Sequence, residues 1–284
     1  MVVDSRLSTR VAIAAAFAAV FALAFWPTFI WMAERFDAHD SFYSHGWLVP
    51  LASGWLLWQR RERLRSCRIR SSAWGLALLV PSLIAHLGAS WLKIGFVSGL
   101  AMIGVITGLV WAWWGREVLK TLRFPLLFLL FMVPLPGVLL IAASFNMKLM
   151  AASLATMLLD LIGIPAQQAG SSISVPGVTV IVDDTCSGLR SLISLVALSV
   201  VWTSFMGKGT KTWKKLTVVA SSIPIALAAN MVRIMTLVLV AAIYGAKAAD
   251  GFIHYGSGLV VFGVALVCLA WVSRTLTRGQ DGAA

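Results

Sequence analysis

Residues 216–242 read LTVVASSIPIALAANMVRIMTLVLVAA, and Arg233 is the single charged residue in this stretch. An α-helix rises about 1.5 Å per residue, and about 20 apolar residues cross the hydrocarbon core of a bilayer. The stretch is therefore predicted to be a transmembrane helix. Apolar runs of similar length recur along the chain, which predicts a polytopic membrane protein.

The composition supports the same conclusion. Of the 284 residues, 60% are hydrophobic and 12% are charged, and the mean hydropathy is +0.89. A soluble domain carries about 25% charged residues, so this chain cannot cover a water-facing surface. A soluble enzyme with one membrane tail is excluded. A disordered chain is excluded as well, because disorder requires low hydrophobicity.

The basic residues indicate topology. The net charge is +12, but most of the Lys and Arg residues fall in short gaps between apolar runs. Cytoplasmic loops of membrane proteins collect Lys and Arg, so the basicity predicts which loops lie inside, and no nucleic-acid partner is expected. The groups predicted to be cytoplasmic are Arg6 and Arg10; Arg60, Arg61, Arg63, Arg65, Arg68 and Arg70; Arg116, Lys120 and Arg123; Lys208, Lys211, Lys214 and Lys215; and Arg274 and Arg278.

Alternating the two sides of the membrane predicts an all-α protein with about eight transmembrane helices and both termini in the cytoplasm. The apolar stretch of the first span is too long for a signal peptide, so it is interpreted as a retained anchor. We expect one transmembrane domain over residues 1–284, in a plasma or inner membrane, with no additional C-terminal soluble domain. The predicted spans are 11–33, 45–59, 73–91, 94–114, 124–144, 187–206, 216–242 and 257–272.

A small extracytoplasmic insertion is predicted at about 145–185. Residues 144–164 are apolar enough to cross, but Lys148 and Asp160 interrupt them. A crossing here would also place one basic loop outside, so the segment is interpreted as an interfacial or re-entrant helix on the outer side. Residues 173–182 form a β-branched run broken by Pro-Gly, which is typical of a β-hairpin.

Cys186 is a candidate nucleophile. The three cysteines are too few and too scattered for a disulfide framework, and Cys186 alone is predicted to face outside. The polar segment Asp184–Gly188 precedes an apolar helix, and a helix N-terminus lowers the pKa of a thiol. Arg190 follows four residues later, on the same predicted helix face, and adds positive charge. The simpler alternative is a small buried hydrophobic residue, as free cysteines commonly are.

Arg233 and His254 are candidate partners of this thiol. An arginine in the centre of a span costs about 2.5–3.5 kcal/mol on insertion scales, so it is a functional hypothesis by default. Asn230 lies three residues earlier, on the same face. The alternative is an arginine that extends to the interface or binds lipid phosphate. His254 precedes the last span on the outer side, whereas His86 lies inside the third span with no evident partner.

Five motifs together resemble the exosortase/archaeosortase family of polytopic cysteine transpeptidases. Each motif alone has little specificity, but they occur in the family's order between about residues 40 and 265. They are Tyr43-Ser44-His45-Gly46-Trp47-Leu48-Val49-Pro50, Val133-Pro134-Leu135-Pro136, Cys186-Ser187-Gly188-Leu189-Arg190-Ser191, Asn230-Met231-Val232-Arg233-Ile234 and Phe252-Ile253-His254-Tyr255-Gly256-Ser257-Gly258.

The resemblance implies a Cys186–Arg233–His254 active site that faces the periplasm or the exterior of a bacterium or archaeon. Family members act on exported proteins with a C-terminal sorting signal, which consists of a motif such as PEP, a transmembrane helix and an Arg-rich tail. The resemblance further implies cleavage and transfer to a cell-surface acceptor, in association with exopolysaccharide. Asp184 stands where many members have Glu, and the carboxylate is retained.

The remaining site residues are expected to support this trio. Asn230 would orient Arg233 or Cys186, and Asp184 and Arg190 would support the site from outside it. Tyr43, Ser44 and His45 would line an outer vestibule, although packing of their loop explains them equally well. No cofactor and no metal ion are expected, and the lipid bilayer is the remaining partner.

Two other classes of function stay open. A transporter or channel also carries charges in its spans, but it commonly shows an internal repeat or paired broken helices, which the sequence lacks. A metalloprotease could use His45, Asp184, Cys186 and His254 as ligands. The chain has no His-Glu-x-x-His motif and no paired Cys-x-x-Cys motif, which makes this class less favoured.

Overall fold

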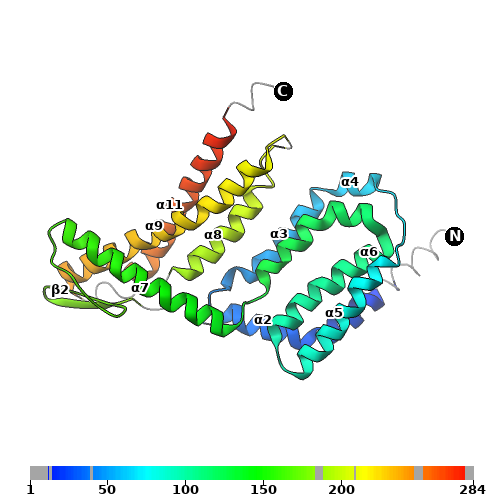
Figure 1. Ribbon diagram of the computed structural model, residues 1–284, viewed down its shortest axis with the longest axis horizontal. Helices are drawn as coiled ribbons and strands as arrows, with labels where there is room; N and C mark the ends of the chain where they lie inside the picture. Colours follow the sequence, from blue (N-terminus) through cyan, green and yellow to red (C-terminus); the bar gives the residue numbers. More distant parts are fainter. Residues whose placement is uncertain are drawn as a thin grey trace. The chain divides into compact units, whose positions relative to one another are not determined.

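The computed structural model describes residue 12 and residues 15–38, 41–182, 188–207, 209–245 and 252–278, with backbone only for 252–255. The chain divides into two compact units (Figure 1). Unit 1 comprises Met1–Ala38 and Ser44–Pro134, and unit 2 comprises His39–Tyr43 and Leu135–Ala284. Each unit is described by itself.

Unit 1 begins with a broken helix. The helix Ala15–Ala24 and α2 (Trp26–Asp37) meet at an angle of 64°. Pro27 in the first turn of α2 has no N–H to continue the preceding helix, which explains the break. The other elements of unit 1 are η1 (Ser44–Trp47), α3 (Leu48–Trp58), α4 (Arg61–Ser66), α5 (Trp74–Trp91), α6 (Gly95–Phe128) and η2 (Leu129–Met132).

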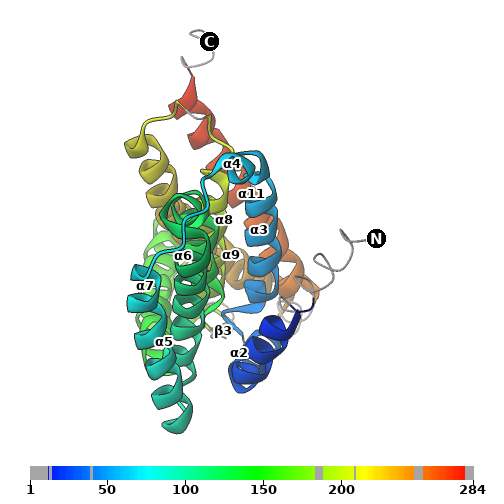
Figure 2. The ribbon, with the colours of Figure 1, turned by 90° about the vertical axis from the view of Figure 1, so that its right-hand side faces the viewer.

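Helices α5 and α6 lie side by side in unit 1 (Figure 2). Small residues allow this close approach, because a Cβ atom at Gly75 or Gly108 would overlap the backbone of the opposite helix. Gly115 interrupts the helical conformation of α6 with a φ of 84°, and its Cα faces the carbonyl oxygen of Arg70 so closely that no side chain fits. The segment after Gly115 therefore leaves the direction of the first half of α6.

Unit 2 combines helices with a small antiparallel sheet. Strands β1 (Gln167–Ala169), β2 (Ser172–Val175) and β3 (Val178–Ile181) pair in the order β1-β2-β3. The Pro176-Gly177 turn joins β2 to β3, with Val175 opposite Val178. The helices of unit 2 are α7 (Gly137–Leu161), α8 (Leu189–Trp202), α9 (Thr212–Tyr244) and α11 (Phe252–Thr277).

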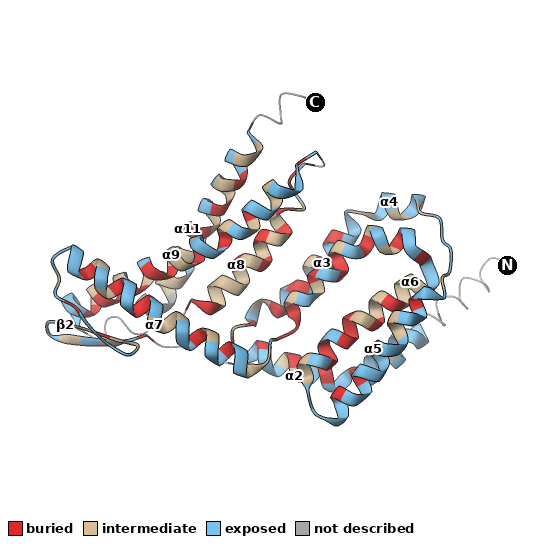
Figure 3. Cartoon of the chain, viewed as in Figure 1, coloured by how far each residue is buried: buried red, intermediate tan, exposed pale blue. Residues whose placement is uncertain are grey.

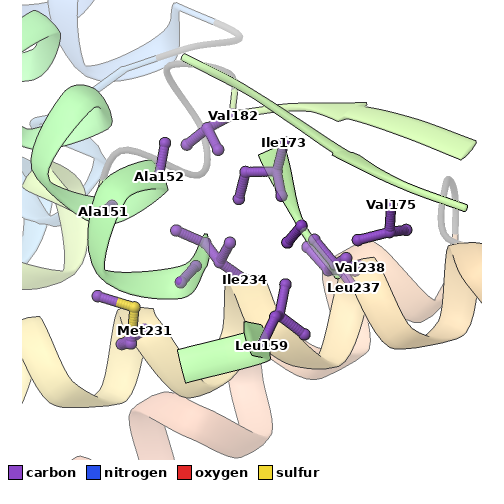
Figure 4. Packing of buried hydrophobic residues seen from close by; sticks show 12 residues of the cluster. Ala151, Ala152, Leu159, Ile173, Val175, Val182, Met231, Ile234, Leu237 and Val238 are labelled. Carbon is purple, nitrogen blue, oxygen red and sulfur yellow. The ribbon is translucent and has the colours of Figure 1, made fainter. Parts of the chain in front are cut away.

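The sheet packs on α7 and α9. Figure 4 shows Ile173 and Val175 of β2 facing Ile234, Leu237 and Val238 of α9. Ile173 and Val238 are completely buried. A second apolar cluster joins α8, α9 and α11, and its fully buried members include Leu195, Val218 and Leu269. Each helix of unit 2 thus has a fixed inward face.

Exposed residues, pale blue in Figure 3, follow the helices, and many of them are large and apolar. Leu259 and Val260 on α11 are 77% and 66% exposed, and Val138 on α7 is 79% exposed. Such surfaces would aggregate in water, but they match the hydrocarbon of a bilayer. The fold is therefore that of a helical, polytopic integral membrane protein, as predicted.

The predicted number of eight spans is not confirmed. Among the described residues, five helices are long and apolar enough to cross a membrane, or six if the bent pair at the start of unit 1 forms one span. The spans predicted at 45–59 and 187–206 correspond to helices of 11 and 14 residues. Both are shorter than the roughly 20 residues that a crossing needs.

The prediction for residues 124–164 is wrong in its boundaries. Pro134 and Pro136 interrupt the chain, so the helix predicted at 124–144 is divided between the end of α6 and the start of α7. Residues 137–161 form one helix of 25 residues that is itself long enough to cross. The predicted separate helix at 144–164 is therefore the second half of α7. The hairpin at 173–182 is confirmed, with β1 as an unpredicted third strand.

Candidate active site

The predicted trio is only partly visible. Cys186 and Asp184 lie outside the described residues, and for His254 only the backbone at the start of α11 is described. The site is therefore built from Arg233 and Asn230 on α9 and from the segments that contact them in unit 2.

Arg233 points into the helical bundle. It is half-buried, its Nε atom is completely buried, and it lines a small cavity of about 30 Å³ between α8, α9 and α11. Asn230 lines the same cavity, so the prediction that these two residues share one helix face is confirmed. Since α9 continues for 11 residues beyond Arg233, about 17 Å, the guanidinium cannot easily extend to the interface at that end. The cavity has room for a water-sized polar group.

Asn230 contacts the backbone that leads into α8. Gly188 precedes α8 with a left-handed φ of 79°, and a Cβ atom added there would lie 2.7 Å from Cγ and Nδ2 of Asn230. Asn230 is 5% exposed. Glycine is therefore required at this position for two reasons, namely its φ angle and the space that Asn230 occupies.

Gly258 brings the start of α11 to the same arginine. A Cβ atom added at Gly258 would lie 3.5 Å from Cζ of Arg233, which is an ordinary contact distance. Position 254 precedes Gly258 by four residues in α11, about one helical turn. Three helices thus converge on the Asn230–Arg233 face.

Arg190 requires a correction. The four-residue spacing from Cys186 was interpreted as one helix face, but α8 begins at Leu189 and the left-handed Gly188 stands before it. The four-residue spacing therefore does not place the two positions on one helix face. Arg190 lies in the first turn of α8. Its Nε atom is buried.

Tyr43 has a defined structural role. Its hydroxyl oxygen accepts a hydrogen bond of 3.2 Å from the N–H of Leu135, and its own N–H donates to Oγ of Ser41. Burial raises the pKa of the Tyr43 phenol above its ordinary value. These contacts agree with the packing interpretation of this loop. Tyr43 belongs to unit 2, whereas Ser44 and His45 belong to unit 1, so the shared vestibule stays a prediction.

His86 has partners that the sequence analysis missed. Its Nε2 atom donates to the carbonyl oxygen of Ala24 at 3.1 Å, so in the neutral ring Nδ1 accepts from Oγ of Ser98 at 2.8 Å. Thr28 and Ser98 are joined by a hydrogen bond of 2.6 Å. The ring also lies 4.0 Å from that of Phe25. Ala24, Thr28 and Ser98 are distant from His86 in the sequence, so the residues around His86 do not predict these contacts.

The described part of the chain contains no candidate metal site. Within it, no group of three His, Cys, Asp or Glu side chains could hold a metal ion. Asp184, Cys186 and His254, three of the four ligands considered, have no described side chains. The metalloprotease alternative therefore keeps its status as a hypothesis.

An apolar groove lies next to the arginine cavity. It has a volume of about 680 Å³ between α9 and α11, and its lining includes Val232, Thr236 and Val260. Ala229 and Val261 line both the groove and the cavity of Arg233. The groove is therefore continuous with the surroundings of Arg233.

The fold and this site define the class as a polytopic membrane protein with an arginine enclosed by three helices. The comparison with protein families agrees, because the model of the transmembrane exosortase family matches residues 31–271. The match covers most of the chain, so the protein belongs to the transmembrane exosortase family. No curated protein and no solved structure shows significant similarity to it.

Proposed function

We propose that this protein is a membrane-embedded cysteine protease or transpeptidase that cleaves C-terminal sorting signals of exported proteins. Cys186 is the nucleophile, Arg233 binds the developing oxyanion or the substrate backbone, and His254 transfers protons. Cleavage takes place on the extracytoplasmic side, and the acyl group held by Cys186 is transferred to a cell-surface acceptor or to water.

The convergence of three helices on Arg233 carries this proposal. Gly188, two residues after Cys186, packs against Asn230, and Gly258, one turn after His254, packs against Arg233. Position 186 is two residues from Gly188, and two residues of chain span at most about 7 Å, which supports a role for Cys186 beside Asn230 and Arg233. The contacts of Gly188 and Gly258 with α9 support the grouping of these three segments that the family resemblance implies.

The proposed reaction has two stages, formation of a thioester on Cys186 and its transfer to the acceptor. The Cys186 thiolate attacks the carbonyl carbon of the scissile peptide bond, and the electron pair moves to the oxygen. Arg233 stabilises this oxyanion, and its cavity of about 30 Å³ suits one small polar group rather than a side chain. His254 protonates the amine that departs and leaves a thioester on Cys186. It then removes a proton from the acceptor, which attacks the thioester and releases the Cys186 thiolate, so that the thiolate and the protonated His254 are restored.

The apolar groove supports a substrate that is itself anchored in the membrane. A sorting signal with a transmembrane helix must reach the active site from the bilayer. The groove between α9 and α11 is lined by valines, Leu259 and the small residues Ala229, Thr236, Gly256 and Ser257, and it shares Ala229 and Val261 with the cavity of Arg233. Small residues allow close helix packing in lipid. We therefore place the substrate helix in this groove.

The decisive experiment measures processing of a co-expressed substrate that carries a sorting signal. Cys186→Ala and His254→Ala are expected to abolish processing while the protein still accumulates in the membrane. Cys268→Ala is the matched control, because Cys268 is an exposed cysteine on α11. Normal processing by Cys186→Ala would refute the nucleophile assignment. Chelator-sensitive processing would favour the metalloprotease instead.

The orientation is tested with a membrane-impermeant maleimide on intact cells, after permeabilisation of an outer membrane where one exists. Cys186 is expected to react first. Cys67, which is half-buried and donates to the carbonyl of Arg63, is expected to react only after lysis. Labelling of Cys67 but not Cys186 in intact cells would show that the orientation is inverted.

A further inference from the structure

Two basic segments of unit 1 lie together although they are about fifty residues apart in the sequence. The first follows α3 and includes α4, and the second is the part of α6 after Gly115. We name their cationic residues the basic platform. Its members are Arg60, Arg61, Arg63, Arg65, Arg68, Arg70, Arg116, Lys120 and Arg123.

Specific contacts hold the two segments together. Nη1 of Arg60 donates to the carbonyl oxygen of Thr121 at 2.8 Å, and the N–H of Arg68 donates to a carboxylate oxygen of Glu117 at 3.0 Å. The N–H of Arg70 donates to the carbonyl oxygen of Trp114 at 3.4 Å. Leu64 and Cys67 pack on the apolar side of the second segment. The platform is therefore a folded feature and not only a pair of basic loops.

The charge of the platform is nearly uncompensated. All its members except Arg60 are exposed, and Glu62 and Glu117 are the two acidic residues between positions 59 and 123. Glu117 is engaged by the N–H of Arg68. Burial, and to a smaller extent the positive charges of Arg63 and Arg123, lower the pKa of Arg60 below its ordinary value. Bringing like charges together costs free energy unless an anion offsets it.

Tryptophans border the platform where the apolar helices end. Trp58 closes α3, Trp74 opens α5, and Trp113 and Trp114 precede the kink of α6. All four are exposed by between 42% and 72%. The guanidinium of Arg61 lies 4.2 Å from the ring of Trp58. Tryptophan favours the headgroup zone of a bilayer, so this border places the platform at headgroup depth.

We propose that the basic platform binds the headgroups of anionic phospholipids in the membrane that the protein spans. The phosphate groups lie at the depth that the tryptophans define, and guanidinium groups bind phosphate oxygens in pairs. If these charges only set the topology of the protein in the membrane, loops without fixed structure would be sufficient. The hydrogen bonds instead hold together the two segments that carry these nine cationic groups.

The test uses the purified full-length protein in a zwitterionic detergent. Binding of fluorescent phosphatidylglycerol and of phosphatidylcholine with the same acyl chains is measured by fluorescence anisotropy. The platform variant combines Arg63→Gln, Arg65→Gln, Arg68→Gln and Lys120→Gln. The control variant combines Lys211→Gln, Lys214→Gln, Arg274→Gln and Arg278→Gln, which removes the same charge from unit 2.

We expect the unmodified protein to bind phosphatidylglycerol more tightly than phosphatidylcholine, and the platform variant to lose about tenfold in phosphatidylglycerol affinity. The control variant should lose less than about twofold. Equal losses in both variants would mean that net charge alone attracts the lipid, and would overturn the proposal. Thermal unfolding of both variants confirms that they are folded.

Two further measurements do not depend on the variants. In about 1 M NaCl, where the Debye length is about 3 Å, the preference of the unmodified protein for phosphatidylglycerol should disappear. A preference that persists would overturn the proposal. Inorganic phosphate at about 10 mM should not displace the lipid, because it lacks the acyl chains that hold the headgroup at this depth. Complete displacement would identify a site for free phosphate instead.

Discussion

His86 in unit 1 and Arg233 in unit 2 are both polar side chains inside apolar helices, but their surroundings differ. His86 is 5% exposed, and both its ring nitrogens have partners within the unit, Ser98 and the carbonyl of Ala24. Arg233 borders a cavity and, beyond Ala229 and Val261, an open groove. His86 is buried and hydrogen-bonded, so we expect it to stabilise the fold, whereas Arg233 borders a cavity and is the candidate for a functional role.

The substitutions with the largest expected effect separate these two roles. Arg233→Lys keeps the charge but loses the planar fork, so we expect processing to fall by more than about 100-fold with little change in thermal stability. His86→Ala should leave processing within about threefold and lower the free energy of unfolding by about 1–3 kcal/mol, because Ser98 and Ala24 lose their partner. Substrate cleavage and thermal unfolding in detergent measure the two effects.

The opposite result would break the comparison. If His86→Ala abolished processing at unchanged stability, His86 would belong to the catalytic machinery. If Arg233→Lys lowered stability as much as His86→Ala does and left processing intact, Arg233 would be structural.

The two glycines near Arg233 give a sharper test of smaller effect. Gly188→Ala forces a left-handed φ and overlaps Asn230, so we expect processing to fall by about tenfold or more. Gly258→Ala places a methyl group 3.5 Å from Cζ of Arg233, an ordinary contact, and should reduce processing less than about threefold. The rates of substrate cleavage are compared at equal protein levels in the membrane. Equal rates for the two variants would show that the contact between Gly188 and Asn230 does not position the site.

A smaller effect than that of Gly188→Ala is expected in the groove. Val260→Trp fills the space between α9 and α11 and should slow processing about fivefold by hindering the substrate helix. Val267→Trp is the matched control, because Val267 lies on the same helix, outside the groove lining, and is 68% exposed against 66% for Val260. Processing kinetics of a membrane-anchored substrate are measured for both. An equal loss in both would assign the effect to lipid contacts in general.

The sequence predicted those features that depend on local pattern. The apolar run around Arg233, the shared face of Asn230 and Arg233, and the hairpin at Pro176-Gly177 each follow from the residue spacing. The boundaries between adjacent apolar runs were less predictable. Pro134 and Pro136 lie inside one apolar stretch, and the sequence alone does not show at which residue the helix before them ends and the next one begins.

Features that depend on distant contacts could not be predicted. Ser98 and the carbonyl of Ala24, two partners of His86, lie 12 and 62 residues away from it, and the carbonyl of Arg70 lies against the kink at Gly115. Strand β1 consists of Gln-Gln-Ala, whose polar residues carry no strand signal, and it forms because β2 supplies a paired edge. For the candidate site, the sequence named the residues, and the structure added Gly188 and Gly258 as the points of contact.

The β-sheet influences the orientation of Arg233 through its packing on α9. Ile234, Leu237 and Val238 of α9 are packed against the sheet and α7. Successive residues of an α-helix are separated by about 100° around its axis. The sheet therefore fixes the rotational phase of α9, and a rotation by one residue would turn Arg233 from the bundle toward another side. The three-stranded sheet contains no predicted catalytic residue, but its packing against α9 keeps the Arg233 side chain directed into the bundle.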